Sequence, residues 1–141
     1  MHATCGAVAL RQTGYAAGLK DGIGRDMPHR LVDELLVAAI IEARSSERMA
    51  LLSRELADTD AELAAFYADL VEAEARHEVL YRDIAIALTD AGYVAERWRA
   101  LTAHEAAVLA GLPWDARLHS GLIAADATNG TTAEVDVGAG H

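Results

Sequence analysis

The stretch IEARSSERMALLSRELADTDAELAAFYADLVEAEARH, residues 41 to 77, decides the fold, because it holds parts of two long helices and the turn between them. In the segment ADTD, residues 57–60, Thr59 lies three positions before Glu62, which is the spacing of a capping box at the start of a helix. No helix breaker precedes this turn as far back as Pro28. The sequence therefore predicts a hairpin of two long antiparallel helices.

The limits of these helices follow from capping signals. Asp26 is the predicted N-cap of the first helix, and Pro28 suits its first turn. The first helix is expected to end near Leu56, and the second to run to about Thr89, with Gly92 as its C-terminal stop. No strand pattern is present, so the predicted class is all-α.

Two shorter helices are expected after the hairpin. They are VAERWRAL at residues 94–101 and AHEAAVLAG at residues 103–111, the second with a capping box from Thr102 to Glu105. Residues 115–141 are small, polar and aperiodic, which predicts a closing segment followed by a disordered tail. Residues 1–25 carry five glycines and predict an irregular lead-in with one short helix near Tyr15. The folded domain is thus expected over residues 26–114.

Polar side chains interrupt the apolar seams of both long helices. Seam positions of the first helix, spaced by fours and threes, are Leu31, Leu35, Ala38, Glu42, Ser45, Met49 and Leu52. Those of the second helix are Leu63, Tyr67, Leu70, Glu74, His77, Tyr81, Ile84 and Leu88. Glu42 lies about as far before the turn as Glu74 and His77 lie after it. The three side chains are therefore expected to meet at one height of the hairpin.

A metal ion would account for this placement. Burying a carboxylate costs several kcal/mol unless it is paired, and one imidazole cannot pair two carboxylates. A Glu-x-x-His pair on one helix, with a glutamate from its neighbour, forms half of the dimetal site of ferritin-like bundles. Imidazole and carboxylate ligands suit iron or manganese. The alternative is a solvated or hydrogen-bonded pair at a helix edge, and the pattern by itself leaves it open.

Further residues are candidates for a role around this cluster. Those that could support the metal ligands are Arg44, Glu47, Tyr67 and Tyr81, although core packing is the usual role of such tyrosines. Candidates for substrate binding are Arg48, Arg76, Arg117 and His119. The pairs Glu72 with Arg76 and Glu78 with Arg82 have the spacing of surface ion pairs along a helix.

The charge of the chain limits its partners. The 141 residues carry 12 basic and 22 acidic side chains, a net charge of -10, which argues against a generic nucleic-acid binder. Binding to RNA would need a local basic patch built from some of Arg44, Arg48, Arg76, Arg82, Arg97 and Arg99. The apolar run from Leu35 to Ile41 is far shorter than the roughly 20 residues of a membrane span. The N-terminus lacks the features of a secretory signal, so a cytoplasmic location is expected.

The segments YAAGL, PHRLVDELLVAAIIEARSSERMALL, FYADLVEAEARHEVLYRDIA and RLHSG closely resemble the MiaE family over residues 15–121. The resemblance implies a ferritin-like di-iron monooxygenase that hydroxylates the isopentenyl group of a modified adenosine in tRNA. It implies that Glu42, Glu74 and His77 are iron ligands, that O₂ is a co-substrate, and that a separate reductase donates electrons. It also matches Arg117 and His119 to a closing motif of the family.

The sequence departs from the family in one large respect. Members have an earlier helix pair that supplies one more glutamate and a second Glu-x-x-His, and the chain resembles the later half alone. The run from Leu35 to Ile41 is apolar on every side and is expected to need cover from outside the chain. We therefore expect a homodimer or a complex with a complementary N-terminal half-protein. The alternatives are a truncated, inactive remnant and a non-enzymatic helical partner subunit.

Overall fold

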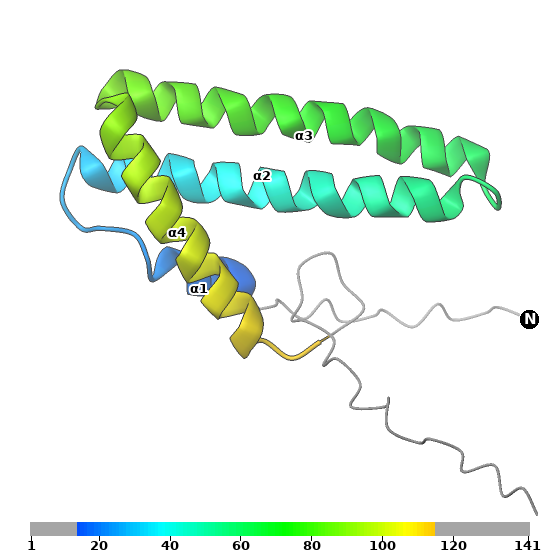
Figure 1. Ribbon diagram of the computed structural model, residues 1–141, viewed down its shortest axis with the longest axis horizontal. Helices are drawn as coiled ribbons and strands as arrows, with labels where there is room; N and C mark the ends of the chain where they lie inside the picture. Colours follow the sequence, from blue (N-terminus) through cyan, green and yellow to red (C-terminus); the bar gives the residue numbers. More distant parts are fainter. Residues whose placement is uncertain (1–13, 115–141) are drawn as a thin grey trace, which may run out of the picture.

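The computed structural model describes residues 14–114, and this part of the chain forms four helices and no strand. They are α1 (Tyr15–Lys20), α2 (His29–Leu56), α3 (Ala61–Leu88) and α4 (Ala91–Gly111). The two long helices, α2 and α3, lie side by side as an antiparallel pair, and α4 runs back obliquely across α2 to reach α1 (Figure 1). The predicted all-α class, the hairpin and the short helix near Tyr15 are confirmed.

The turn of the hairpin lies where it was predicted, but its capping residue differs. Asp60 is the N-cap of α3, and its carboxylate accepts a hydrogen bond of 3.0 Å from the backbone N–H of Leu63. The hydroxyl of Thr59 instead donates to the carbonyl of Leu56 at 3.4 Å, so the predicted capping box from Thr59 to Glu62 is wrong. Two adjacent residues could cap this helix, and the carboxylate also interacts favourably with the positive end of the helix dipole.

The start of α2 also differs from the prediction. The helix begins at His29, and its N-cap, Pro28, makes no capping hydrogen bond through a side chain. Asp26 contributes its backbone carbonyl, which accepts from the N–H of Arg30 at 2.8 Å, whereas the prediction gave it a side-chain cap.

A single continuous helix, α4, replaces the two short helices that were expected. It begins at the N-cap Asp90, whose carboxylate accepts from the N–H of Tyr93 at 2.8 Å, so Gly92 lies inside α4 and does not end α3. In the middle of α4 the hydroxyl of Thr102 donates to the carbonyl of Trp98 at 2.8 Å. A threonine can bond in this way to the preceding turn without ending a helix.

The core lies between α2, α4 and α1. Its largest buried side chains include Tyr15, Leu19, Leu36, Ile40 and Leu101. The short helix α1 packs very close to α4, because a Cβ atom added at Gly18 would lie 2.8 Å from Cγ1 of Val108. A side chain at position 18 would therefore push these two helices apart.

The apolar run of α2 is largely covered by the chain itself. Leu36, Val37, Ala39 and Ile40 are buried, and only the other three residues of the run are half-buried. The expectation that the whole run from Leu35 to Ile41 needs outside cover is therefore wrong, because residues of α1, α3 and α4 pack with it in one core. None of the four helices is long and apolar enough to cross a membrane.

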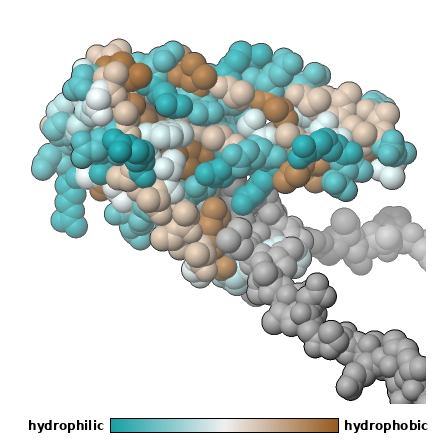
Figure 2. Space-filling view, viewed as in Figure 1, coloured by the Kyte–Doolittle hydropathy of each residue, from teal (hydrophilic) through white to brown (hydrophobic). Residues whose placement is uncertain are grey.

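The exposed apolar surface lies mainly on the helix pair. In α3 only Ala64 and Ala85 are buried. Large apolar side chains that remain exposed on α2 and α3 are Leu51, Leu52, Leu63, Phe66, Val79, Leu80, Ile84, Ile86 and Leu88. Figure 2 shows hydrophobic patches among hydrophilic side chains over this pair. Within residues 14–114, the two helices are thus covered by α1 and α4 on one side and lack a comparable layer on the other.

One buried ion pair ties α4 to α2 near the beginning of both helices. Asp33 is 1% exposed, and its two carboxylate oxygens accept hydrogen bonds of 2.8 Å from Nε and from one terminal nitrogen of Arg97. The same carboxylate accepts from the N–H of Gly24 at 2.9 Å, and Arg97 also donates to the carbonyl of Gly22 at 3.1 Å. The pair therefore fixes the loop between α1 and α2 as well.

Candidate metal centre

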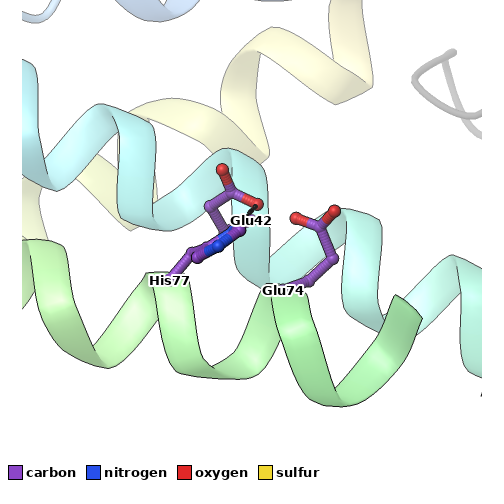
Figure 3. A group of neighbouring side chains, drawn as sticks. All are labelled: Glu42, Glu74 and His77. Carbon is purple, nitrogen blue, oxygen red and sulfur yellow. Dashed lines mark ion pairs between the residues drawn. The ribbon is translucent and has the colours of Figure 1, made fainter. Parts of the chain in front are cut away.

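Glu42 on α2 and Glu74 and His77 on α3 come together midway along the helix pair. One ligand atom from each residue can be chosen so that all three lie within 4.8 Å of one another. Nδ1 of His77 is 3.8 Å from one carboxylate oxygen of Glu42. Figure 3 shows Glu42 reaching toward His77, with the carboxylate of Glu74 on the same side of the pair. The structure thus brings these three predicted residues together at one height.

The cluster lies at the edge of the covered region. The side chain of Glu42 is 21% exposed and that of His77 is 53% exposed, while Glu74 is half-buried. One imidazolium could balance only one of the two carboxylate charges. The site therefore gathers negative charge on a face of the helix pair that the described part of the chain leaves open.

The donor set suits a transition metal, although the chain supplies few ligands. Two carboxylates and an imidazole are typical ligands of iron and manganese. Ligand atoms around one such ion lie at most about 4 Å apart, so the three side chains need only small movements to bind it. Three donors leave coordination positions free, and these must be filled by water, by substrate or by a second set of protein ligands.

Arg44 and Glu47, predicted to support the cluster, interact elsewhere. Nε of Arg44 donates to Oε1 of Glu105 at 2.8 Å, and a terminal nitrogen of Arg44 donates to both oxygens of Glu47 at 2.7 Å. Tyr67 and Tyr81, which were also predicted to support the cluster, are both half-buried on α3. The ring of Tyr67 contacts that of Phe66 edge to face, at 5.7 Å between centroids.

The arginines do not form the basic patch that RNA binding was expected to need. Arg44, Arg76, Arg82 and Arg97 each form an ion pair with a carboxylate. The pairs of Arg76 with Glu72 and of Arg82 with Glu78 are those predicted from helix spacing. Arg99 is exposed and Arg48 is half-buried. Two further substrate-binding candidates, Arg117 and His119, lie outside the described residues.

A second polar cluster, which the sequence did not predict, lies on the opposite side of α2. Glu105 of α4 is 1% exposed, and its Oε1 accepts from the hydroxyl of Tyr15 at 2.9 Å and from Arg44. Burial and the bond to Glu105 raise the pKa of Tyr15 well above its ordinary value, so its phenol stays protonated and donates. The bond to Glu105 likewise raises the pKa of Arg44. These partners are 61 and 90 positions apart in sequence, and no local pattern links them.

An antiparallel helix pair with a glutamate on one helix and Glu-x-x-His on the other is half of a ferritin-like bundle. A solved structure confirms the fold: the protein described as "Protein 43 with aldehyde deformylating oxygenase activity from Synechococcus" superposes with a TM-score of 0.73 at 37% sequence identity. The match covers 81% of this chain and 57% of that one. The chain is therefore a ferritin-like helical protein.

The family model MiaE, described as tRNA-(MS[2]IO[6]A)-hydroxylase, matches residues 4–120, and the chain belongs to this family. It is 38% identical over 108 residues to the tRNA 2-(methylsulfanyl)-N(6)-isopentenyladenosine(37) hydroxylase of Pseudomonas putida. It is 35% identical over 118 residues to the protein of the same name from Salmonella typhimurium.

The chain spans only about half the length of these curated relatives. The matches cover 77% and 84% of this chain, but 51% and 42% of the two relatives. The activity of these longer relatives is therefore only proposed for this chain.

Proposed function

We propose that this chain supplies half of a metal-dependent tRNA hydroxylase that acts on the isopentenyl group of a modified adenosine, and that a second chain completes the site. The observation that carries the proposal is the cluster of Glu42, Glu74 and His77, whose ligand atoms lie within 4.8 Å of one another on two neighbouring helices. Membership of the family, and the names of the two curated relatives, supply the reaction and the substrate class.

The three residues would hold iron, with manganese as the alternative of similar ligand preference. When bound, a di-iron centre supplies the activation of O₂ and the insertion of one oxygen atom into a C–H bond, with electrons from an external donor. The two carboxylates would offset charge of the ions, and the imidazole of His77 would add a nitrogen donor. Since Glu42 lies on α2 and the other two ligands on α3, packing of the hairpin sets their separation.

Two observations support a second chain as the source of the missing ligands. Three ligands are half of the four glutamates and two histidines of a ferritin-like dimetal site. The same helix pair exposes large apolar side chains, including Leu63, Phe66 and Leu80, as a subunit does when its partner is missing. Two copies related by a two-fold axis would supply the full ligand set, and so would a complementary N-terminal half-protein. We favour the homodimer, because it needs no other component.

The substrate must bind without a large basic surface on this chain. The net charge is -10, and four of the arginines considered are held by carboxylates. We therefore expect weak tRNA binding, with phosphate contacts supplied in part by the second chain.

Activity is tested with tRNA that carries 2-methylthio-isopentenyladenosine. The protein is reconstituted with Fe²⁺ and incubated with this tRNA, O₂ and a reductant, and the nucleosides are then analysed by mass spectrometry. We expect the modified nucleoside to gain one oxygen atom, and no gain with tRNA that lacks the isopentenyl group. An iron-loaded assembly that leaves the nucleoside unchanged would contradict the hydroxylase.

A non-enzymatic partner subunit is the second candidate, and the exposed apolar side chains of α3 favour it. The hydroxylation assay described above distinguishes this candidate from the hydroxylase. A partner subunit would neither bind iron nor form product alone, but would bind a complementary helical protein.

A further inference from the structure

Two buried ion pairs join α2 to α4, and they lie at different heights relative to the proposed metal ligands. Arg44 to Glu105 and Asp33 to Arg97 both have a carboxylate that is 1% exposed and a contact of 2.8 Å. Arg44 follows Glu42 by two residues, or about 3 Å along the helix axis, whereas Asp33 precedes it by about 13 Å. The two pairs therefore allow a comparison of similar interactions near the site and away from it.

We infer that Arg44 and Glu105, with Tyr15, are positioning residues that fix the rotation of α2 at the height of Glu42. The inference rests on the proposed metal site and goes beyond it, because these residues lie on the opposite side of α2 from that site.

The helix α2 packs extensively against α3, and close to the site the hydroxyl of Ser46 donates to the carbonyl of Val71 at 3.4 Å. The buried residues of α3 are Ala64 and Ala85, near its two ends, and Val71, close to the site, is only half-buried. The apolar contact near the site is therefore partly open to solvent. A set of metal ligands must nevertheless be held to about 0.5 Å and 10–20° to bind well. Contacts on the other side of α2 at this height would add to the control that α3 gives.

The Glu105 cluster has the geometry to limit it. Glu105 projects from α4, and its Oε1 receives one donor from α1, the hydroxyl of Tyr15, and one from α2, Nε of Arg44. Glu47, one turn further along α2, holds the other edge of the same guanidinium. Charged hydrogen bonds are directional, so this arrangement resists turning of α2 in a way that apolar contacts would not.

Such a cluster is more easily explained by positioning than by stability. Well-packed apolar residues often replace a buried ion pair without loss of stability, whereas the loss of one partner is costly. If the cluster orients Glu42, apolar residues in its place would not restore that orientation. This difference separates the positioning role from a purely structural one.

The test compares two conservative variants of the full chain, Glu105→Gln and Asp33→Asn. Each removes the charge of one buried carboxylate and keeps its shape. The apparent dissociation constant for Co²⁺ is measured from its visible absorption, well below the unfolding temperature of each variant. We expect both variants to unfold at lower temperature, but only Glu105→Gln to bind Co²⁺ more weakly, by about tenfold or more. Equal Co²⁺ affinities of the two variants would overturn the inference.

A triple variant keeps the inference testable if Glu105→Gln does not fold. In the triple variant Tyr15→Phe, Arg44→Met, Glu105→Leu, the three polar groups are removed together and apolar packing replaces them. We expect stability to recover and Co²⁺ binding to stay weaker than in the unmodified chain. A folded triple variant that binds Co²⁺ as tightly as the unmodified chain would show that the cluster has only a structural role.

Amide hydrogen exchange tests the positioning role in the metal-free protein. In Glu105→Gln we expect faster exchange in α2 around Glu42, and in Asp33→Asn faster exchange only near the start of α2. If the unmodified chain binds no Co²⁺, the proposed function fails, and the exchange pattern alone decides the inference. Unchanged exchange around Glu42 in Glu105→Gln would then reject it.

Discussion

Replacing Arg97 with methionine is expected to lower the free energy of unfolding by about 3–5 kcal/mol, because it leaves a buried carboxylate without its cation. Asp33 is 1% exposed and receives two hydrogen bonds of 2.8 Å from Arg97. Its remaining donor would be the backbone N–H of Gly24. The change also frees the carbonyl of Gly22 and so loosens the loop between α1 and α2. Urea denaturation followed by circular dichroism measures the loss.

The matched control is Arg76→Met on α3. Arg76 lies 3.9 Å from Glu72, and both side chains are more than 70% exposed, so this change should alter stability by less than about 0.5 kcal/mol. An equally small loss for Arg97→Met would mean that water reaches Asp33 in solution and that α4 does not pack on α2 as described.

Replacing Glu74 with alanine is expected to abolish stable metal binding. The change removes one of three ligands from each chain, and in a symmetric dimer two of the six ligands are lost together. The remaining Glu42 and His77 are typical of a weak surface site rather than a dimetal centre. Metal content after gel filtration should fall from about one iron per chain to near zero, while the helical signal in circular dichroism is retained.

The control for this change is Glu72→Ala, two residues earlier on the same helix. Glu72 is exposed and lies outside the cluster, so its loss removes the same charge from the chain without removing a ligand. Iron content equal to that of the unmodified protein is expected. If both variants retain iron, the metal binds elsewhere and the assignment of the three residues is wrong.

The hairpin and the cluster could be predicted because the signals for both are local. Apolar spacing, the turn at residues 57–60 and the spacing of Glu74 and His77 are each contained in one short window. The position of Glu42 followed from its distance to the turn. Local signals failed where two neighbours could serve the same purpose, and Asp60 rather than Thr59 caps α3 for this reason.

The rest of the fold depends on contacts between distant residues. Thr102 and Glu105 have the spacing of a capping box, but Glu105 instead pairs with Arg44, 61 positions earlier, and α4 continues through both. Asp33 of α2 is buried against Arg97 of α4, 64 positions later, and no local pattern predicts this pair. In the same way, the apolar run of α2 is covered by residues of α1, α3 and α4, whose packing cannot be inferred from α2 alone.

The most direct test of the proposed half-site is native mass spectrometry of the full chain during titration with Fe²⁺ in the absence of O₂, because it reports assembly and metal content in one spectrum. We expect a dimer that binds two iron ions, one for each set of Glu42, Glu74 and His77. A complementary half-protein, added to the same titration, would give a heterodimer with two iron ions if it is the true partner. A monomer that binds no iron, with or without such a partner, would contradict the account.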